Sequence, residues 1–363
     1  MKRKILTPFF LLCTIWAWGQ QYPGYAYHPE QYVALRSLTA LEVDGKLDEA
    51  SWQKAAWSSD FVDIEGDHAP AAPYHQTRVK MLWDDTYLYI GAELEEPHIW
   101  ATYTNRDAVI FHENDFEVFI DPDGDSHNYY ELEVNALGTI WDLILLKPYR
   151  DGGPALNAWD IQGLKSAVHL YGTLNDPSDV DERWTVELAF PWKMLKEAAK
   201  PARAPQDGEQ WRINFSRVHW KIKSVDGQYR KEIDPATGKN FPEYNWVWSE
   251  QGKIAMHQPE TWGYVQFSDI SVGDQVVAFT PSPLESVKWS LYQLYYAQRT
   301  YFETKGAYAP SIGNLKLEAV HERALASHVT ISVSPVSYDA IYRNGKTVLT
   351  IDQEGKLQNL SQP

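Results

Sequence analysis

Three carboxylates crowd within five residues, at Asp121, Asp123 and Asp125, and the oxygen-bearing Ser126 and Asn128 follow them. Oxygen ligands at alternate positions suit Ca²⁺, which takes roughly six to eight of them. The spacing differs from that of an EF-hand, because the twelfth position counted from Asp121 is a leucine rather than a glutamate. The segment predicts a structural Ca²⁺ site at Asp121, Asp123 and Asp125, with a solvated acidic turn as the alternative.

A second group of residues has the types that recognise sugars. Aromatic rings stack on the apolar face of a pyranose, and planar polar groups hydrogen-bond its hydroxyls. Between residues 214 and 262 the candidates are Arg217, Trp220, Trp246, His257 and Glu260. Trp141 and Trp159 are further candidates, and Gly152-Gly153 between them predicts a mobile loop. The alternative is that these tryptophans fill a core without touching a ligand.

Carboxylates for glycoside hydrolysis are also available. Such enzymes need two carboxyl groups roughly 5 to 10 Å apart, one of them with a raised pKa. Glu131, Glu133, Asp142 and Glu260 are candidates, but the chain has no nucleophile elbow, phosphate loop, HExxH motif or Cys/His cluster. A glycan-processing enzyme is therefore an alternative to a non-catalytic binding protein, and a structural cell-surface interaction domain is a third possibility.

The elements that must position these residues have the period of two that is typical of strands. In residues 114–135, Phe116, Val118 and Ile120 alternate with polar residues, and the second half of the segment continues the pattern. Further strands are expected over residues 79–94, 138–146, 184–190, 211–220 and 263–267. Because turn signals separate these strands and few helices intervene, the fold is predicted to be mainly β, an antiparallel β-sandwich.

The first residues have the pattern of a signal peptide. Lys2-Arg3-Lys4 precedes an apolar run over residues 5–18, and small residues at Ala17 and Gly19 predict cleavage before Gln20. The only cysteine of the chain, Cys13, lies inside this run, so the mature protein would have no disulfide. No other stretch is long and apolar enough to span a bilayer. We expect an exported, periplasmic or extracellular protein without membrane insertion.

Composition narrows the class of partner. The formal net charge is −16, which argues against nucleic acid and anionic membrane surfaces as partners. The 16 Trp and 22 Tyr are compatible with sugar binding, although sandwich cores also use many aromatic side chains. A neutral polysaccharide remains compatible with this composition.

Five motifs in a fixed order carry a family resemblance: VDGKLDEASW, VKMLWDDTYLYIGAELEEP, NDFEVFIDPDG, WTVELAFPWKML and WGYVQF. Together, over residues 38–271, they resemble the family 9 carbohydrate-binding modules. The resemblance implies a β-sandwich that binds poly- or oligosaccharides. It also implies calcium as a structural ion, and glycoside hydrolases of plant polysaccharides secreted with the module.

The resemblance further implies two aromatic residues that clamp the terminal sugar. The matching positions hold Phe111, just before the EVFID strand, and Met256, shortly before WGYVQF. A positively charged residue of the family falls at Glu133. The clamp of this chain is therefore expected to be altered, since a thioether stacks on a sugar less well than an indole.

The chain divides into four segments by these patterns. Residues 1–19 are the expected signal peptide, 20–37 an extended leader and 38–271 the carbohydrate-binding sandwich. After residue 283 the apolar residues repeat at helical spacing up to Thr304, and two strands are expected around a turn at Asn344-Gly345. Residues 284–363 are thus predicted to be a small α+β extension that could dock on the sandwich or recruit a partner.

Overall fold

The computed structural model describes residues 27–361. The expected signal peptide, its cleavage point before Gln20 and Cys13 lie outside these residues. The strands of the sandwich part are β1 (Gln31–Arg36), β2 (Val62–Asp63), β3 (Thr77–Trp83), β4 (Tyr87–Glu95), β5 (Asp115–Asp121), β6 (Tyr129–Asn135), β7 (Ile140–Leu145), β8 (Ala155–Leu156), β9 (Lys165–Tyr171), β10 (Arg183–Pro191), β11 (Gln210–His219), β12 (Ile222–Val225), β13 (Gln228–Lys231), β14 (Tyr244–Val247) and β15 (Gly263–Ser271). Its helices are α1 (Ala50–Lys54), α2 (Trp192–Leu195) and the 3₁₀ turns η1 (Gly66–His68), η2 (Ile110–His112), η3 (Tyr149–Asp151) and η4 (Pro259–Thr261).

The main sheet runs in the order β8-β7-β6-β5-β11-β15-β1-β3-β4-β10-β9, and β14 and β2 attach through β11. β1 pairs in parallel with both β15 and β3, whereas the other pairs of this sheet are antiparallel. Side chains of β3, β4 and β10 pack with those of β5, β6 and β11 in one buried core, so the two arms of the sheet face each other. The mainly β, sandwich-type fold predicted from the sequence is confirmed.

The alternation in β5 and β6 decides which side chains enter this core. Phe116, Val118 and Ile120 are buried there, as are Tyr130 and Leu132 on the partner strand. Because side chains alternate between the faces of a strand, the residues between them lie on the outer face of the same arm. That outer face carries the acidic residues of both strands.

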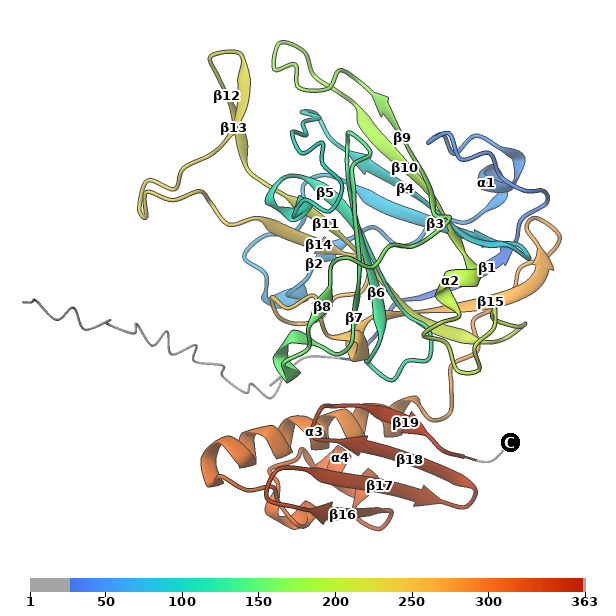
Figure 1. The fold of residues 1–363 in the computed structure, drawn as a ribbon, viewed down its shortest axis with the longest axis vertical. Coiled ribbons are helices and arrows are strands. Elements are labelled where there is room, and N and C mark those ends of the chain that lie inside the picture. The colour runs from blue at the N-terminus through green and yellow to red at the C-terminus, as the bar shows by residue number, and fades with distance from the viewer. Residues whose placement is uncertain (1–26, 362–363) are drawn as a thin grey trace, which may run out of the picture.

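One segment differs from the sequence-based expectation. β1, which joins the two arms of the sandwich, lies within the segment expected to be an extended leader. A hairpin of β12 and β13 projects from the sandwich (Figure 1).

The C-terminal unit is a helix packed on a small sheet. It contains α3 (Glu285–Lys305), η5 (Ile312–Asn314), α4 (Ala319–Leu325), β16 (Val329–Val333), β17 (Tyr338–Asn344), β18 (Thr347–Asp352) and β19 (Leu357–Asn359). The last four strands form an antiparallel sheet in sequence order, and the turn at Asn344-Gly345 joins β17 to β18 as predicted. α3 ends at Gly306 with a φ of 68°, a backbone conformation in which glycine avoids the steric cost of a side chain. None of the described helices is long and apolar enough to cross a bilayer.

α3 lies between its own sheet and one end of the sandwich (Figure 1). At its start Glu285 accepts a hydrogen bond of 3.1 Å from Arg212 of β11. Further along, the hydroxyl of Tyr292 lies 2.8 Å from that of Ser126, in the acidic turn between β5 and β6. The C-terminal unit is therefore docked on the sandwich through buried polar contacts.

Candidate functional site

The outer face of β5, β6 and β7 joins apolar and acidic residues on one surface. Phe119, Tyr129, Trp141 and Leu143 form an apolar cluster there together with Trp262. The pairing of β5 with β6 sets Glu117 directly opposite Glu133, and β7 places Trp141 on the other side of Glu133. Strand register thus places an indole ring beside a group of carboxylates.

Phe111 and Met256 lie at the edge of this apolar cluster, half-buried. The ring centroids of Phe111 and Trp141 are 6.4 Å apart, with 26° between the ring planes. Tyr149, with 49% of its surface exposed, packs edge-on against His257 at 4.6 Å. The two clamp positions expected from the family resemblance therefore belong to one rim, which we define as Phe111, Trp141, Tyr149, Met256 and His257.

Backbone contacts hold the rim in place. The amide N–H of Phe111 donates to Glu133 Oε2 at 2.9 Å, and the carbonyl of the same residue accepts from Trp220 Nε1 at 3.0 Å. The carbonyl of Met256 accepts from Trp262 Nε1 at 3.0 Å. Trp220, a sequence-based candidate for ligand contact, is buried and supports Phe111 from behind.

The carboxylates of β5 and β6 that neighbour the rim are buried. Asp115, Glu117, Glu131 and Glu133 are each at most 5% exposed. Burial raises the pKa of Glu117 to about 7. Burial and the neighbouring charge of Glu117 raise the pKa of Asp115 and of Glu131 well above the ordinary range, and burial with the Asp115 charge does the same for Glu133. Like charges that share a dry site disfavour ionisation of one another.

His257 and Glu260 lie where the sandwich meets α3. Burial, and then the charge of Arg150, lower the pKa of His257 to about 4, and its Nδ1 lies 3.0 Å from the hydroxyl of Tyr129. Glu260 makes a two-pronged ion pair with Arg150, with N to O distances of 2.8 and 3.0 Å. The hydroxyl of Tyr296 of α3 also donates to Glu260. The carboxylate of Glu260 thus helps to hold the loop over residues 248–262, which we call the rim loop because it carries the rim residues Met256 and His257.

Arg217 and Trp246 lie away from this rim. Arg217 is 1% exposed and donates to Glu96 at 2.9 Å and to Thr77 at 3.0 Å. Trp246 is also 1% exposed and stacks on His219 at 4.8 Å. In this structure neither side chain exposes a face on which a sugar could bind. A pocket of about 190 Å³ lies near them, lined in part by Tyr74, His75 and Trp220.

Replacing Trp246 by phenylalanine tests whether it acts only in packing. We expect a loss of about 2 kcal/mol in the free energy of unfolding, because a buried ring becomes smaller and leaves a cavity. Affinity for any saccharide that the protein binds should stay within about twofold. Urea unfolding and titration calorimetry on the same preparation give both values. A large loss of affinity in a folded variant would return Trp246 to the ligand site.

Trp159 also lies apart from the rim. Its ring stacks on Tyr130 with 5.1 Å between centroids, and it packs against the interior core of the sandwich. Asp142, next to Trp141, points to the same interior side, where its carboxylate accepts from the amide of Ile161 at 2.6 Å and pairs with Arg106. The candidates Trp141 and Trp159 therefore occupy opposite faces of the sheet.

Two lysine side chains pair with the carboxylates of the turn that follows Asp121. Lys200 Nζ lies 2.7 Å from Asp123 and 2.8 Å from Asp125, and Lys356 lies 3.6 Å from Asp125. Asp121 accepts the amides of Gly124 and Ser126 at 3.0 and 2.8 Å. The carboxylate oxygens that would bind Ca²⁺ thus already accept hydrogen bonds or pair with lysine. Lys200 would have to move for the ion to enter. Calcium at this turn stays a prediction.

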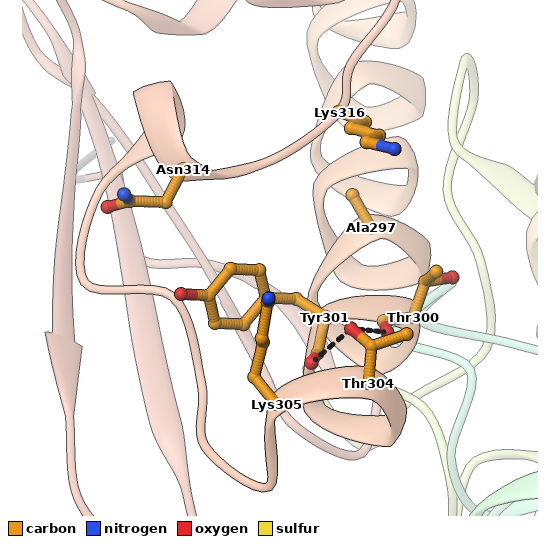
Figure 2. A pocket seen from close by; sticks show the side chains of 7 residues that line it. All are labelled: Ala297, Thr300, Tyr301, Thr304, Lys305, Asn314 and Lys316. Atoms are coloured by element: carbon orange, nitrogen blue, oxygen red, sulfur yellow. Dashed lines mark hydrogen bonds between the residues drawn. The ribbon is translucent and has the colours of Figure 1, made fainter.

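A separate pocket of about 360 Å³ lies in the C-terminal unit, between α3 and the segment that carries Asn314 and Lys316 (Figure 2). Thr304 on its wall already donates to the carbonyls of Thr300 and Tyr301 at 3.0 Å. The residues that line this pocket include no acidic side chain, and Tyr301 is the one aromatic side chain among them. The pocket therefore offers no pair of aromatic rings like that of the rim.

Sequence reasoning missed Tyr149 as a rim residue and did not group the four carboxylates. Tyr149 follows β7 in the short turn η3, and no pattern in the sequence separates it from the other tyrosines. The carboxylates could have been grouped, because Glu131 and Glu133 share a face and a tight hairpin brings β5 alongside.

Comparisons with known proteins agree with this architecture. Residues 43–269 match the family model described as carbohydrate family 9 binding domain-like. An exoglucanase XynX of Acetivibrio thermocellus is 28% identical over 155 residues, which is 42% of this chain and 12% of that enzyme. An endo-1,4-beta-xylanase C of Paenibacillus barcinonensis is 36% identical over 90 residues, 24% of this chain and 7% of that enzyme. The chain thus spans about a tenth of the length of these curated relatives.

Among solved structures, a family 9 carbohydrate-binding module of Caldicellulosiruptor kristjanssonii in complex with cellotriose is similar to this chain. It is 15% identical with a TM-score of 0.41, and the match covers 69% of this chain and 100% of that one.

Proposed function

The chain belongs to the family of carbohydrate family 9 binding domain-like proteins, and we propose that it is an exported protein that binds poly- or oligosaccharides without cleaving them. The observation that carries the proposal is the rim of Phe111, Trp141, Tyr149, Met256 and His257 above the outer face of β5, β6 and β7. Phe111 and Tyr149, the partly exposed aromatic side chains of the rim, can stack on a sugar ring.

The proposed role is to assist polysaccharide breakdown by holding glycan chains or oligosaccharides. The curated relatives are named as an exoglucanase and xylanases, of which this chain matches only a small part. We therefore propose that hydrolases secreted alongside this protein supply the cleavage. Cello- and xylo-oligosaccharides are the probes that these names suggest first.

Titration calorimetry of the purified protein with cello- and xylo-oligosaccharides tests the proposal, with released reducing ends assayed in the same samples. Saturable binding without new reducing ends is the expected result. Release of reducing ends would instead make the protein a glycan-processing enzyme, since closely spaced carboxyl groups with a raised pKa are also what a glycosidase needs. No binding across a panel of neutral and acidic glycans would refute saccharide recognition.

A further inference from the structure

Three groups of carboxylates in residues 27–361 are close enough to share a cation, and they differ in what neutralises them. Asp121, Asp123 and Asp125 are bridged by Lys200. In the group of Asp107, Asp142 and Asp160, Arg106 reaches all three carboxylates. The third group, Asp115, Glu117 and Glu133, makes no ion pair with any lysine, arginine or histidine of the described residues. Burying carboxylates without a countercharge is costly. This group lacks the neutralising cation that the other two groups have.

Unpartnered oxygen atoms point to what is missing. In this third group, Asp115 is fully buried, and its Oδ2 has no hydrogen-bond partner, although Oδ1 lies within 3.4 Å of the amide of Val218. Glu131, on the same face as Glu133, is 5% exposed, and its Oε2 is likewise unpartnered. In the register of β5 with β6, Glu131 pairs with Phe119 and is therefore the diagonal neighbour of Glu117 on the same face. A buried acceptor without a donor is rare in native proteins unless an ion or water completes it.

We propose that Asp115, Glu117, Glu131 and Glu133 form a binding site for a hard divalent cation of the size of Ca²⁺, separate from the Asp121 turn. One oxygen from each of Asp115, Glu117 and Glu133 lies within 4.8 Å of the others. Ligands on opposite sides of Ca²⁺ are about 4.6 to 5.2 Å apart at its usual bond lengths, so the three oxygen atoms are close enough to bind one ion of this size. The site offers only oxygen atoms, which disfavours zinc, a metal that prefers nitrogen and sulfur ligands.

The cation would stabilise the rim through Glu133, which accepts a hydrogen bond from a rim residue. Glu133 holds the amide of Phe111, and Glu117 faces Glu133 across the hairpin, so a cation between them would fix both strands and one clamp residue. Its binding is measured without any sugar, and the result therefore does not depend on whether the proposed saccharide recognition is correct.

The test is titration of chelator-treated protein with CaCl₂ by calorimetry, for the wild type and for two matched double variants. Glu131→Gln with Glu133→Gln removes two charges from the proposed site, and Asp123→Asn with Asp125→Asn removes two from the turn. We expect about one Ca²⁺ per wild-type chain with a dissociation constant of about 1 mM or tighter. Affinity should fall at least tenfold in the Glu variant and less than threefold in the Asp variant.

Tb³⁺ luminescence gives a local readout, because Trp141 is the cross-strand neighbour of Glu133 and can sensitise an ion bound there. The expected signal is reversed by excess Ca²⁺ and is absent from the Glu variant. Circular dichroism is the check that both variants are folded, and removing repelling charges should leave the Glu variant at least as stable as calcium-free wild type. A wild type that binds no Ca²⁺, or binding lost only in the Asp variant, would overturn the proposal.

Discussion

Replacing Arg150 by methionine is expected to lower the free energy of unfolding by about 3 to 5 kcal/mol, the usual cost of removing one partner from a buried ion pair. The side chain of Glu260 is fully buried and that of Arg150 is 17% exposed, and two hydrogen bonds join them. The methionine variant would leave the Glu260 carboxylate without its guanidinium partner, while the hydroxyl of Tyr296 still donates to it. Urea unfolding measures the loss.

A double variant distinguishes the stability lost with the ion pair from the stability lost through poorer packing. Adding Glu260→Leu to Arg150→Met removes the stranded charge, and we expect at least half of the lost stability to return, since paired apolar replacements are often close to neutral. Losses that add up in the double variant would contradict this interpretation. Because Arg150 also contacts the carbonyl of His257 and the hydroxyl of Tyr295, the single variant should loosen both the rim loop and the docking of α3.

Replacing Tyr149 by alanine is expected to weaken saccharide binding roughly ten- to hundredfold, or about 1.4 to 2.8 kcal/mol. Its ring is half exposed beside His257, and its hydroxyl lies close enough to Glu131 and Glu133 for their charges to raise its pKa, after burial as the main cause. Loss of this ring removes a rim face without opening the core. Titration calorimetry with the best-bound oligosaccharide measures the change.

Tyr74 offers a matched control for Tyr149. It is 51% exposed, against 49% for Tyr149, and lines the pocket beside Trp246 instead of the rim. Tyr74→Ala should therefore leave the affinity within about twofold. If Tyr74→Ala weakens binding and Tyr149→Ala does not, the saccharide occupies the other pocket and the rim has been assigned wrongly.

The strand pattern of residues 114–135 was predictable because β5 and β6 obey one rule, alternation against a single core. The positions of Phe111 and Met256 could be taken from motif spacing, because both lie next to strands that the motifs fix. The predicted family and sandwich are confirmed, and so is the small C-terminal α+β unit.

The environment of individual side chains could not be predicted in the same way. Arg217 has the chemistry of a sugar ligand, yet Glu96, 121 positions earlier in the chain, pairs with it inside the fold. Glu260 has the chemistry of a catalytic carboxylate, yet Arg150 and a helix beyond the sandwich enclose it. In both residues the role is set by a partner distant in sequence, and neither composition nor periodicity contains that information.

The most direct test of the central claim is a crystal structure of the protein with the oligosaccharide that binds most tightly. We expect the sugar on the outer face of β5, β6 and β7, between Phe111 and Met256 and in contact with Tyr149. A sugar bound beside Tyr74 and Trp220, or in the pocket of the C-terminal unit, would contradict the account.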